Sequence, residues 1–172
     1  AFFKMPVIML MLITLLNDGT LISIAYDYAT ASTTPNRWNL PAIFLTSSTL
    51  GAVSCGSSLL LLSFLLNSWD PKGFFAAVGM TPLQYGQVTT AIYLKVSVSD
   101  FLTLFSSRTG RDYFWSVKPA PMLFGGCCFA LGLSSILALF WPTGEIDGVA
   151  VEGLSHNVGL FFFVWLFSLV FW

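Results

Sequence analysis

Charged residues are scarce in this chain. Lys, Arg, Asp and Glu make up 9% of its 172 residues, whereas an ordinary soluble domain carries roughly 25%. Hydrophobic residues account for 56% of the chain, and the mean hydropathy is +0.80. A water-soluble fold could not bury so much apolar surface, so part of the surrounding solvent must be lipid. The composition argues against a water-soluble domain and predicts an all-α, polytopic bundle of membrane helices.

Basic tracts, histidine and cysteine are also scarce, and this limits the classes of ligand. The net charge is −1 and no run of basic residues occurs, so nothing points to nucleic acid or to anionic lipid headgroups. The single histidine, His156, has no metal-ligating neighbours in the sequence. The three cysteines (Cys55, Cys127 and Cys128) lie in apolar segments and are expected to be packing residues. We expect no metal site and no catalytic residue in this chain.

Hydrophobic segmentation predicts about five spans, because crossing a bilayer takes roughly 20 residues of helix. The apolar stretches lie at about 2–26, 42–66, 88–107, 120–141 and 157–172. The short alternating segments of a membrane barrel are absent. We therefore expect residues 1–172 to form a single transmembrane bundle with no soluble domain. Both ends of the sequence are hydrophobic and there is no initiator Met, so we expect a piece of a longer protein or a portion of a subunit.

The charges of the loops predict a topology. With five alternating spans, basic and acidic loops fall on opposite sides of the membrane. The residues expected on one side are Arg37, Arg108 and Arg111, and those expected on the other are Glu145, Asp147 and Glu152. Because basic loops stay in the cytoplasm, the positive-inside rule predicts that the arginine-bearing loops are cytoplasmic.

The first span carries a carboxyl group at mid-membrane depth. Asp18 follows an almost wholly apolar segment and lies within the run Asn17–Thr20, which is made of weak helix formers. We therefore expect the helix to become irregular around Asn17–Gly19 and the carboxyl to face the bundle interior. A desolvated carboxyl can bind and release a proton near neutral pH. Asp18 and Asn17 are thus the candidate proton-binding residues. The alternative is a protonated Asp hydrogen-bonded to a neighbouring helix.

The third span carries a polar stripe. Tyr93, Ser97, Asp100 and Ser107 share one helical face. Lys95 points elsewhere and could snorkel or pair with another span. Such a face serves either as an interior hydrogen-bonding seam or as an ion pathway. The sequence leaves both interpretations open.

Small residues recur every four positions in two other spans, where they would let helices approach closely. These stripes are Ser48, Ala52 and Gly56 in the second span, and Gly126, Ala130 and Ser134 in the fourth.

Several segments resemble P-type plasma-membrane proton ATPases. The first span, with its core Leu15–Thr20 (LLNDGT), is similar to the sixth membrane helix of those pumps. Further similarities, in chain order, are found at 34–41 (TPNRWNLP), 91–97 (AIYLKVS) and 151–153 (VEG). The segment 101–108 (FLTLFSSR) is similar to protist members. The resemblance implies that the chain is the C-terminal membrane region of such a pump, helices six to ten.

The resemblance implies ATP-driven proton export, with Asp18 matching the family's proton-binding residue. The phosphorylation motif Asp-Lys-Thr-Gly-Thr and the Thr-Gly-Glu-Ser loop are absent, so this chain alone would not hydrolyse ATP. No cofactor is expected here, since ATP and magnesium would bind to domains that this sequence does not include. The expected partners are the lipid bilayer and either the rest of the pump or a separate protein chain, which would complete a half-site at Asp18.

Two other functions remain open at this stage. The chain could be a non-catalytic, pump-derived accessory or structural subunit of a larger membrane complex, or a small independent channel or carrier. The resemblance favours the plasma membrane, with an organelle membrane as the alternative.

Overall fold

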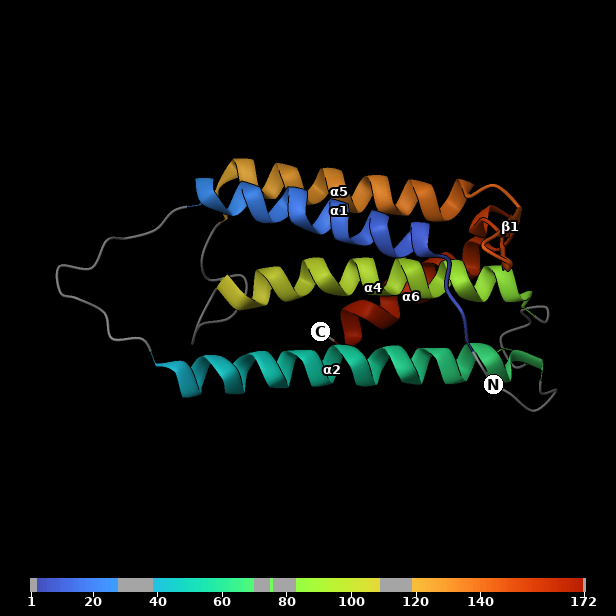
Figure 1. The fold of residues 1–172 in the computed structure, drawn as a ribbon, viewed down its shortest axis with the longest axis horizontal. Helices are drawn as coiled ribbons and strands as arrows, with labels where there is room; N and C mark the ends of the chain where they lie inside the picture. Colours follow the sequence, from blue (N-terminus) through green and yellow to red (C-terminus); the bar gives the residue numbers. More distant parts are fainter. Residues whose placement is uncertain (1–2, 28–38, 70–74, 76–82, 109–118, 172) are drawn as a thin grey trace.

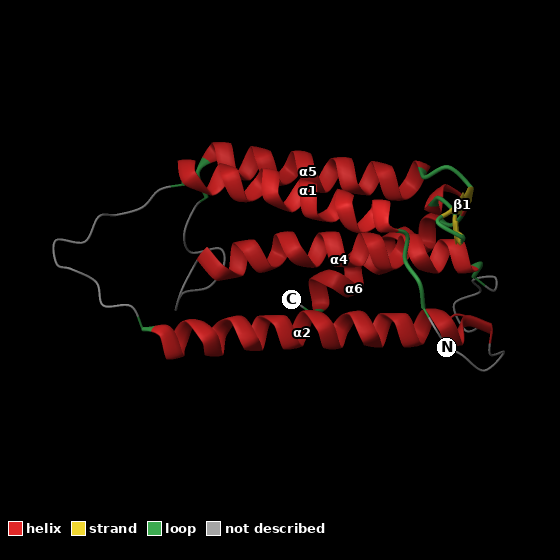
Figure 2. Cartoon of the chain, in the orientation of Figure 1, coloured by secondary structure: helices red, strands yellow, loops and turns green. Residues whose placement is uncertain are grey.

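A computed structural model describes residues 3–27, 39–69, 75, 83–108 and 119–171 of the chain. These residues form five α-helices of 13 residues or more (Figures 1 and 2). The helices are α1 (Val7–Ser23), α2 (Leu40–Leu66), α4 (Tyr85–Arg108), α5 (Pro121–Phe140) and α6 (Val158–Val170). Three-residue 3₁₀ helices follow α1 (Ile24–Tyr26) and α2 (Asn67–Trp69) and precede α6 (Leu154–His156). The all-α fold class predicted from composition is confirmed.

Four of these helices are long and apolar enough to cross a membrane. They are α1 with its 3₁₀ extension, α2, α4 up to Ser107, and α5. The last helix, α6, has 13 residues and so extends only about 20 Å, less than the roughly 30 Å of a hydrocarbon core. The fifth span expected at about 157–172 is therefore a helix too short to cross the hydrocarbon core upright, and four of the five predicted spans are long enough to do so.

Prolines mark where several helices begin and end. Pro41 and Pro121 stand in the first turn of α2 and of α5, where a missing N–H costs nothing because that group has no partner within the helix. Pro142 follows the end of α5 and biases Trp141 towards an extended conformation, so the helix stops at Phe140.

The central helix of the bundle is α4. Figure 1 shows α1 and α5 side by side along one flank of α4 and α2 along the opposite flank, while α6 also packs against α4. The main hydrophobic core follows α4, whose buried apolar residues include Ala91, Leu94 and Val98. This arrangement places the polar residues of the third predicted span in the middle of the molecule.

Successive long helices run in opposite directions. Figure 1 places the end of α1, the start of α2, the end of α4 and the start of α5 at one end of the bundle. Glu145, Asp147 and Glu152 lie at the other end. Arg37 and Arg111 fall outside the described residues, and Arg108 is the last residue of α4. The helix ends therefore agree with the predicted grouping of the loops, whereas the cytoplasmic assignment stays a prediction.

A small β-hairpin, which the sequence interpretation treated as loop, connects α5 to the last helix. Strands β1 (Gly144–Ile146) and β2 (Val149–Val151) pair antiparallel around Asp147 and Gly148, whose φ angles are 54° and 71°. An Asp-Gly pair with two positive φ angles is the favoured two-residue hairpin turn. The hairpin closes one end of the bundle: Gln87 Nε2 at the start of α4 donates to Glu152 Oε1 at 3.2 Å.

The first helix is regular where the sequence predicted an irregular segment. α1 is continuous from Val7 to Ser23, so the expected break at Asn17–Gly19 is wrong. Thr20 Oγ1 donates to Asn17 O at 2.7 Å, and Ser23 Oγ donates to Thr20 O at 2.6 Å. These hydroxyls are satisfied by the helix itself. A Gly costs only about 1 kcal/mol in a helix, whereas each unpaired backbone group in lipid costs several, so the helix persists.

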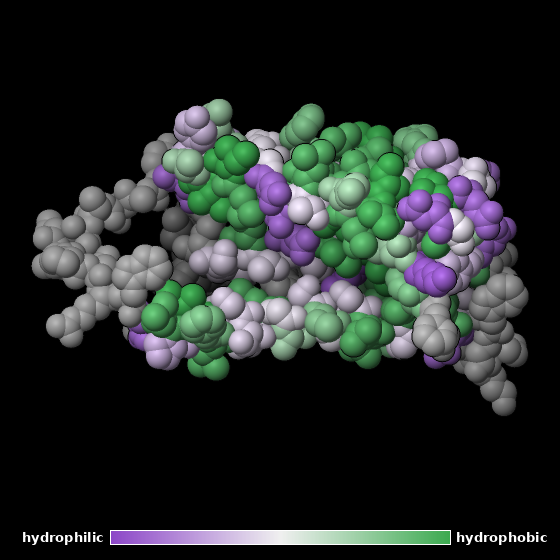
Figure 3. Space-filling view, viewed as in Figure 1, coloured by the Kyte–Doolittle hydropathy of each residue, from purple (hydrophilic) through white to green (hydrophobic). Residues whose placement is uncertain are grey.

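The surface of the bundle is largely hydrophobic. Figure 3 shows apolar side chains over much of the upper part of one face, hydrophilic side chains gathered at the hairpin end, and a smaller hydrophilic group in the middle of the face. Exposed apolar residues occur on α1, α2, α5 and α6, for example Leu15, Phe44, Phe129 and Phe162. Such a surface suits contact with lipid or with other membrane helices.

Candidate functional site

Asp18 lies on the outer face of α1. The residue is exposed and lines a shallow hollow formed by α1 alone, with Val7, Leu10, Met11, Thr14 and Leu15. The expectation that its carboxyl faces the interior of this bundle is therefore wrong within the described part of the chain. Of the neighbours in this hollow, only Thr14 carries a polar side chain, and its hydroxyl already donates to Leu10 O at 2.9 Å.

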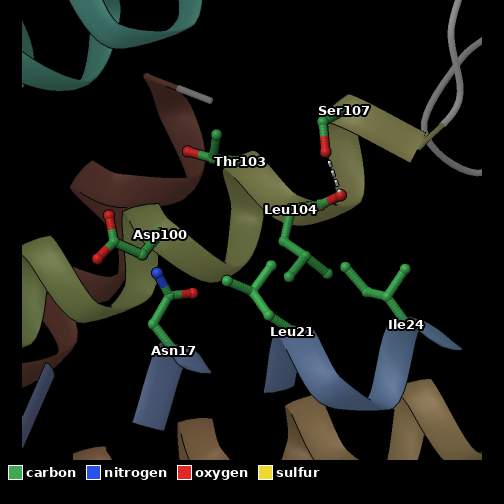
Figure 4. A pocket seen from close by; sticks show the side chains of 7 residues that line it. All are labelled: Asn17, Leu21, Ile24, Asp100, Thr103, Leu104 and Ser107. Carbon is green, nitrogen blue, oxygen red and sulfur yellow. Dashed lines mark hydrogen bonds between the residues drawn. The ribbon is translucent and has the colours of Figure 1, made fainter. Parts of the chain in front are cut away.

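Asn17 lies on a different side of α1 from Asp18. Adjacent residues of an α-helix point about 100° apart, because one turn takes 3.6 residues. Asn17 is half-buried and lines a cavity of about 220 Å³ between α1 and α4. Figure 4 shows its side chain directed from α1 towards Asp100 of α4. The two candidate proton-binding residues therefore lie on different sides of the same helix.

Asp100 is half-buried at the meeting point of two cavities. It lines the cavity with Asn17 and also a second one of about 470 Å³ between α2 and α4. Thr103 and Ser107 line both cavities as well, so the three α4 residues form a shared polar wall. The α2 side of the larger cavity includes Ser47, Gly51, Ser54, Cys55 and Ser58. Asp100 thus stands between two cavities bordered by α1 and α2, whose linings mix polar side chains with apolar ones such as Leu21, Leu50 and Leu104.

Lys95 is completely buried, with 0% of its surface exposed. Its ammonium group donates to Ser57 Oγ at 2.7 Å, Ser58 Oγ at 2.7 Å and the carbonyl oxygen of Ser54 at 3.0 Å, all on α2. The carboxyl of Asp100 also interacts with it electrostatically. Of the two sequence-based alternatives, Lys95 therefore pairs with another span and does not snorkel to the membrane surface.

Tyr93 and Ser97 form an interior seam between α4 and α5. Ser134 Oγ donates to Ser97 Oγ at 2.7 Å and lies 3.4 Å from the Tyr93 hydroxyl oxygen, and all three residues are buried. Asp100, by contrast, faces the cavities next to α1 and α2. The stripe predicted as one face is thus divided: Tyr93 and Ser97 hold helices together, while Asp100 borders open polar space.

Sequence reasoning missed the serines that surround Lys95. Ser54, Ser57 and Ser58 are spaced three and four residues apart on one face of α2, and this spacing was available as a signal in an otherwise apolar span. The stripe singled out instead, Ser48, Ala52 and Gly56, remains largely exposed. The α5 stripe does pack: Ala130 and Ser134 are buried, and a Cβ added at Gly126 would lie 3.2 Å from Ser23 Oγ of α1.

The described residues offer oxygen ligands and charges but no metal centre: in that part of the chain, no three His, Cys, Asp or Glu side chains come together. What the arrangement can do is hold protons or compensate charge inside a membrane. Asp18 offers a carboxyl on the outside of the bundle. Asp100 and Lys95 offer opposite charges within it.

Comparison with known proteins identifies relatives over almost the entire chain. No family model matches. The chain is 44% identical over 180 aligned residues to the probable proton ATPases 1B and 1A of Leishmania donovani, and each alignment covers 99% of this chain and 18% of the relative. It is 32% identical over 156 residues to the probable plasma membrane ATPase of Dictyostelium discoideum, covering 90% of this chain and 14% of that protein.

The relatives and the apolar helices agree on the class of protein. The chain is a multi-pass integral membrane protein, and four helices among its described residues are able to cross a bilayer. It spans 18% of the length of the first two relatives. These matches confirm the resemblance indicated by the motifs: over almost its whole length the chain is related to P-type proton ATPases and corresponds to a membrane segment of such proteins.

Proposed function

We propose that this chain is the C-terminal membrane segment of a plasma-membrane P-type proton ATPase and that it supplies part of the proton pathway. The observation that carries the proposal is the position of Asp18. A carboxyl group in the middle of an apolar span is exposed on the outer face of α1, among its apolar side chains. Insertion of a charged residue at this depth costs about 2.5–3.5 kcal/mol or more, so such residues rarely face lipid.

We propose that a second helix with a polar side chain covers this face of α1, so that Asp18 does not contact lipid. Val7, Leu10, Met11 and Leu15 are between 49% and 69% exposed and share the hollow with Asp18. A second helix could bury these side chains and offer a hydrogen-bond donor to the carboxyl. The proton ATPases to which the chain is related are much longer than the matched segment, so the remainder of the pump is the proposed partner. ATP and magnesium would bind to that remainder.

The inner side of α1 gives the pathway a proposed continuation. Asn17, next to Asp18 in the sequence, borders the cavity shared with Asp100. Small movements of α1 would change which side of the helix the proton-binding group can reach, as alternating access requires. In this proposal Asp18 carries the proton, Asn17 and Asp100 line the polar space beside it, and Tyr93 and Ser97 hold α4 against α5.

The test compares two identical substitutions in the assembled pump, reconstituted into vesicles. Asp18→Asn keeps the shape of the side chain but cannot release a proton, so ATP-dependent proton flux should fall to background. Asp147→Asn is the matched control. Its side chain is exposed in the hairpin turn, where φ is 54°, and Asn tolerates that conformation. Flux in the control should equal that of the unmodified pump.

The outcome of this test also separates the proposal from the accessory-subunit alternative. If the chain is only a structural part of a larger complex, Asp18→Asn will leave proton flux at the control level. That result would remove Asp18 from the pathway. Amounts of assembled protein must be matched between the variants, so that a folding defect is not counted as a transport defect.

A further inference from the structure

The ammonium of Lys95 occupies a complete oxygen cage. A lysine ammonium has three N–H donors, and the structure provides three acceptors within 3.0 Å: Ser54 O, Ser57 Oγ and Ser58 Oγ. The residue is 0% exposed, although it lies near the middle of a helix able to cross the membrane. The cage therefore satisfies the buried cation fully, with all three acceptors from a single neighbouring helix.

The hydroxyl hydrogens of the cage point away from the lysine. Ser57 Oγ donates to Ser54 O at 3.0 Å, and Ser58 Oγ donates to Ser54 O at 2.7 Å. Since each hydroxyl has a single hydrogen, both present lone pairs to Lys95. A neutral amine would need a donor for its own lone pair, and the cage has none to give. The α2 serines are thus prearranged to surround a positive charge.

A carboxyl group lies near this charge, beside the same cavity. Asp100 interacts electrostatically with Lys95, and it lines the 470 Å³ cavity together with Ser54 and Ser58 of the cage. Backbone carbonyl, hydroxyl and carboxylate oxygens are the ligands that hard metal cations take in proteins and channels. The same oxygens would suit a monovalent metal cation if the ammonium were not there.

We propose that Lys95 is a tethered cation: its ammonium fills an oxygen site between α2 and α4 that would otherwise bind Na⁺ or K⁺. A metal cation entering from the cavity would meet a fixed like charge and ligands already in use. Protons need no such cage, because they move along hydrogen bonds and water. Lys95 is therefore a specificity-determining residue that keeps metal cations out of this membrane segment. Its role in a proton pump rests on the proposed function, whereas the cage itself does not.

The experiment removes the tethered charge in the complete pump and supplies metal cations. Lys95→Met has a similar length and leaves the oxygens without a cation. In detergent, this variant should bind radioactive Rb⁺ (a K⁺ substitute) or radioactive Na⁺ stoichiometrically, and its Tm should rise in KCl or NaCl relative to choline chloride. The unmodified pump and Lys95→Arg, which keeps a positive charge, should bind neither cation.

Two further variants make the test specific. Lys95→Met combined with Asp100→Asn should lose the cation binding that Lys95→Met gains, because the carboxylate supplies the compensating charge. Lys95→Gln is used if the Met variant does not fold. More folded protein of either variant should be recovered in detergent with KCl or NaCl than with choline chloride. A folded variant that binds neither cation overturns the proposal. Failure of both variants to fold in all three salts also overturns it. Cation binding is measured without proton flux, so it is independent of the Asp18 result.

Discussion

The central helix and the first helix each carry an ionisable side chain within an apolar span, and the surroundings of these two side chains differ. In α4, 72% of the most apolar stretch is buried by the other helices of the chain, whereas only 17% is buried in α1 and in α2. The buried ammonium of α4, on Lys95, has three hydrogen bonds within the chain. The carboxyl of α1, on Asp18, has no hydrogen-bonding partner among the described residues and is exposed. The charge of α4 is thus satisfied within the described part of the chain, whereas we propose that the outer face of α1 is covered by a further partner.

This contrast indicates which faces of the helices have their polar groups satisfied within the chain and which do not. Apolar surface does not distinguish a lipid-facing helix from one that contacts protein, because lipid and Leu side chains are equally apolar. Polar groups do distinguish them, since each one at membrane depth needs a partner. A charged group with hydrogen-bonding partners in the chain therefore indicates an interior formed by these helices. A charged group without such partners indicates a surface where we expect another helix to bind.

The largest expected effect concerns the closed end of the bundle, at Gly153. A Cβ at this position would lie 2.6 Å from Leu139 O and 2.7 Å from Trp141 O, and backbone atoms cannot yield as a flexible side chain can. We expect Gly153→Ala to destabilise the folded chain by about 3 kcal/mol, seen as a lower Tm of the assembled pump in detergent.

Gly132→Ala is the control for this change. Gly132 is exposed on α5, and a Cβ there would meet nothing within 4 Å. An unchanged or slightly higher Tm is expected, because Ala favours helix over Gly by about 1 kcal/mol. Equal losses from the two substitutions would show that the α5–hairpin junction is not the rigid closure described above.

A second prediction concerns the cage that completes α4. Ser57→Ala removes one of the three acceptors of a buried ammonium, and hydrogen bonds to charged groups contribute about 1.5–3 kcal/mol. We expect a loss of free energy of unfolding in that range. Ser63→Ala, on the same helix, should cost almost nothing, because Ser63 is exposed and its hydroxyl donates to its own helix, at Leu60 O. A loss at Ser63 as large as that at Ser57 would contradict the assignment.

The smallest expected effect concerns the seam between α4 and α5. Ser97 and Ser134 share a buried hydrogen bond of 2.7 Å, and such bonds between membrane helices average about 0.6 kcal/mol. The double-mutant cycle Ser97→Ala with Ser134→Ala should give a coupling energy near that value, measured as free energy of unfolding. A coupling indistinguishable from zero would mean that packing alone holds the two helices.

Hydrophobic segmentation predicted the fold class, because a long apolar segment in lipid satisfies all its backbone hydrogen bonds internally only as a helix. The same argument explains why the expected break at Asn17–Gly19 was wrong. Local propensity is worth less than the backbone hydrogen bonds that a break would expose. The hairpin at Asp147–Gly148 was predictable, since an Asp-Gly pair between alternating residues favours that turn. It was missed because membrane segmentation treats everything between spans as loop.

The candidate site was less predictable than the fold. Sequence identified Lys95 and Asp100 as unusual, but the hydrogen-bond acceptors of Lys95 come from α2, roughly 40 positions away, and no helical periodicity within α4 reveals them. The direction of Asp18 was mispredicted for a related reason. The preference of charged residues for a bundle interior applies to a whole assembly, and in the proposed pump this chain would supply only the helices on one side of Asp18.

The central claim is that the face of α1 around Asp18 is covered by the rest of the pump, and photo-cross-linking tests it most directly. A diazirine-bearing residue placed at Leu15 of α1 is compared with one at Phe129 of α5, positions that are 69% and 71% exposed in this chain. In the assembled pump, we expect the probe at Leu15 to cross-link to polypeptide outside residues 1–172 and the probe at Phe129 to react with lipid. Reaction with lipid alone at Leu15, in a pump that still hydrolyses ATP, would contradict the account.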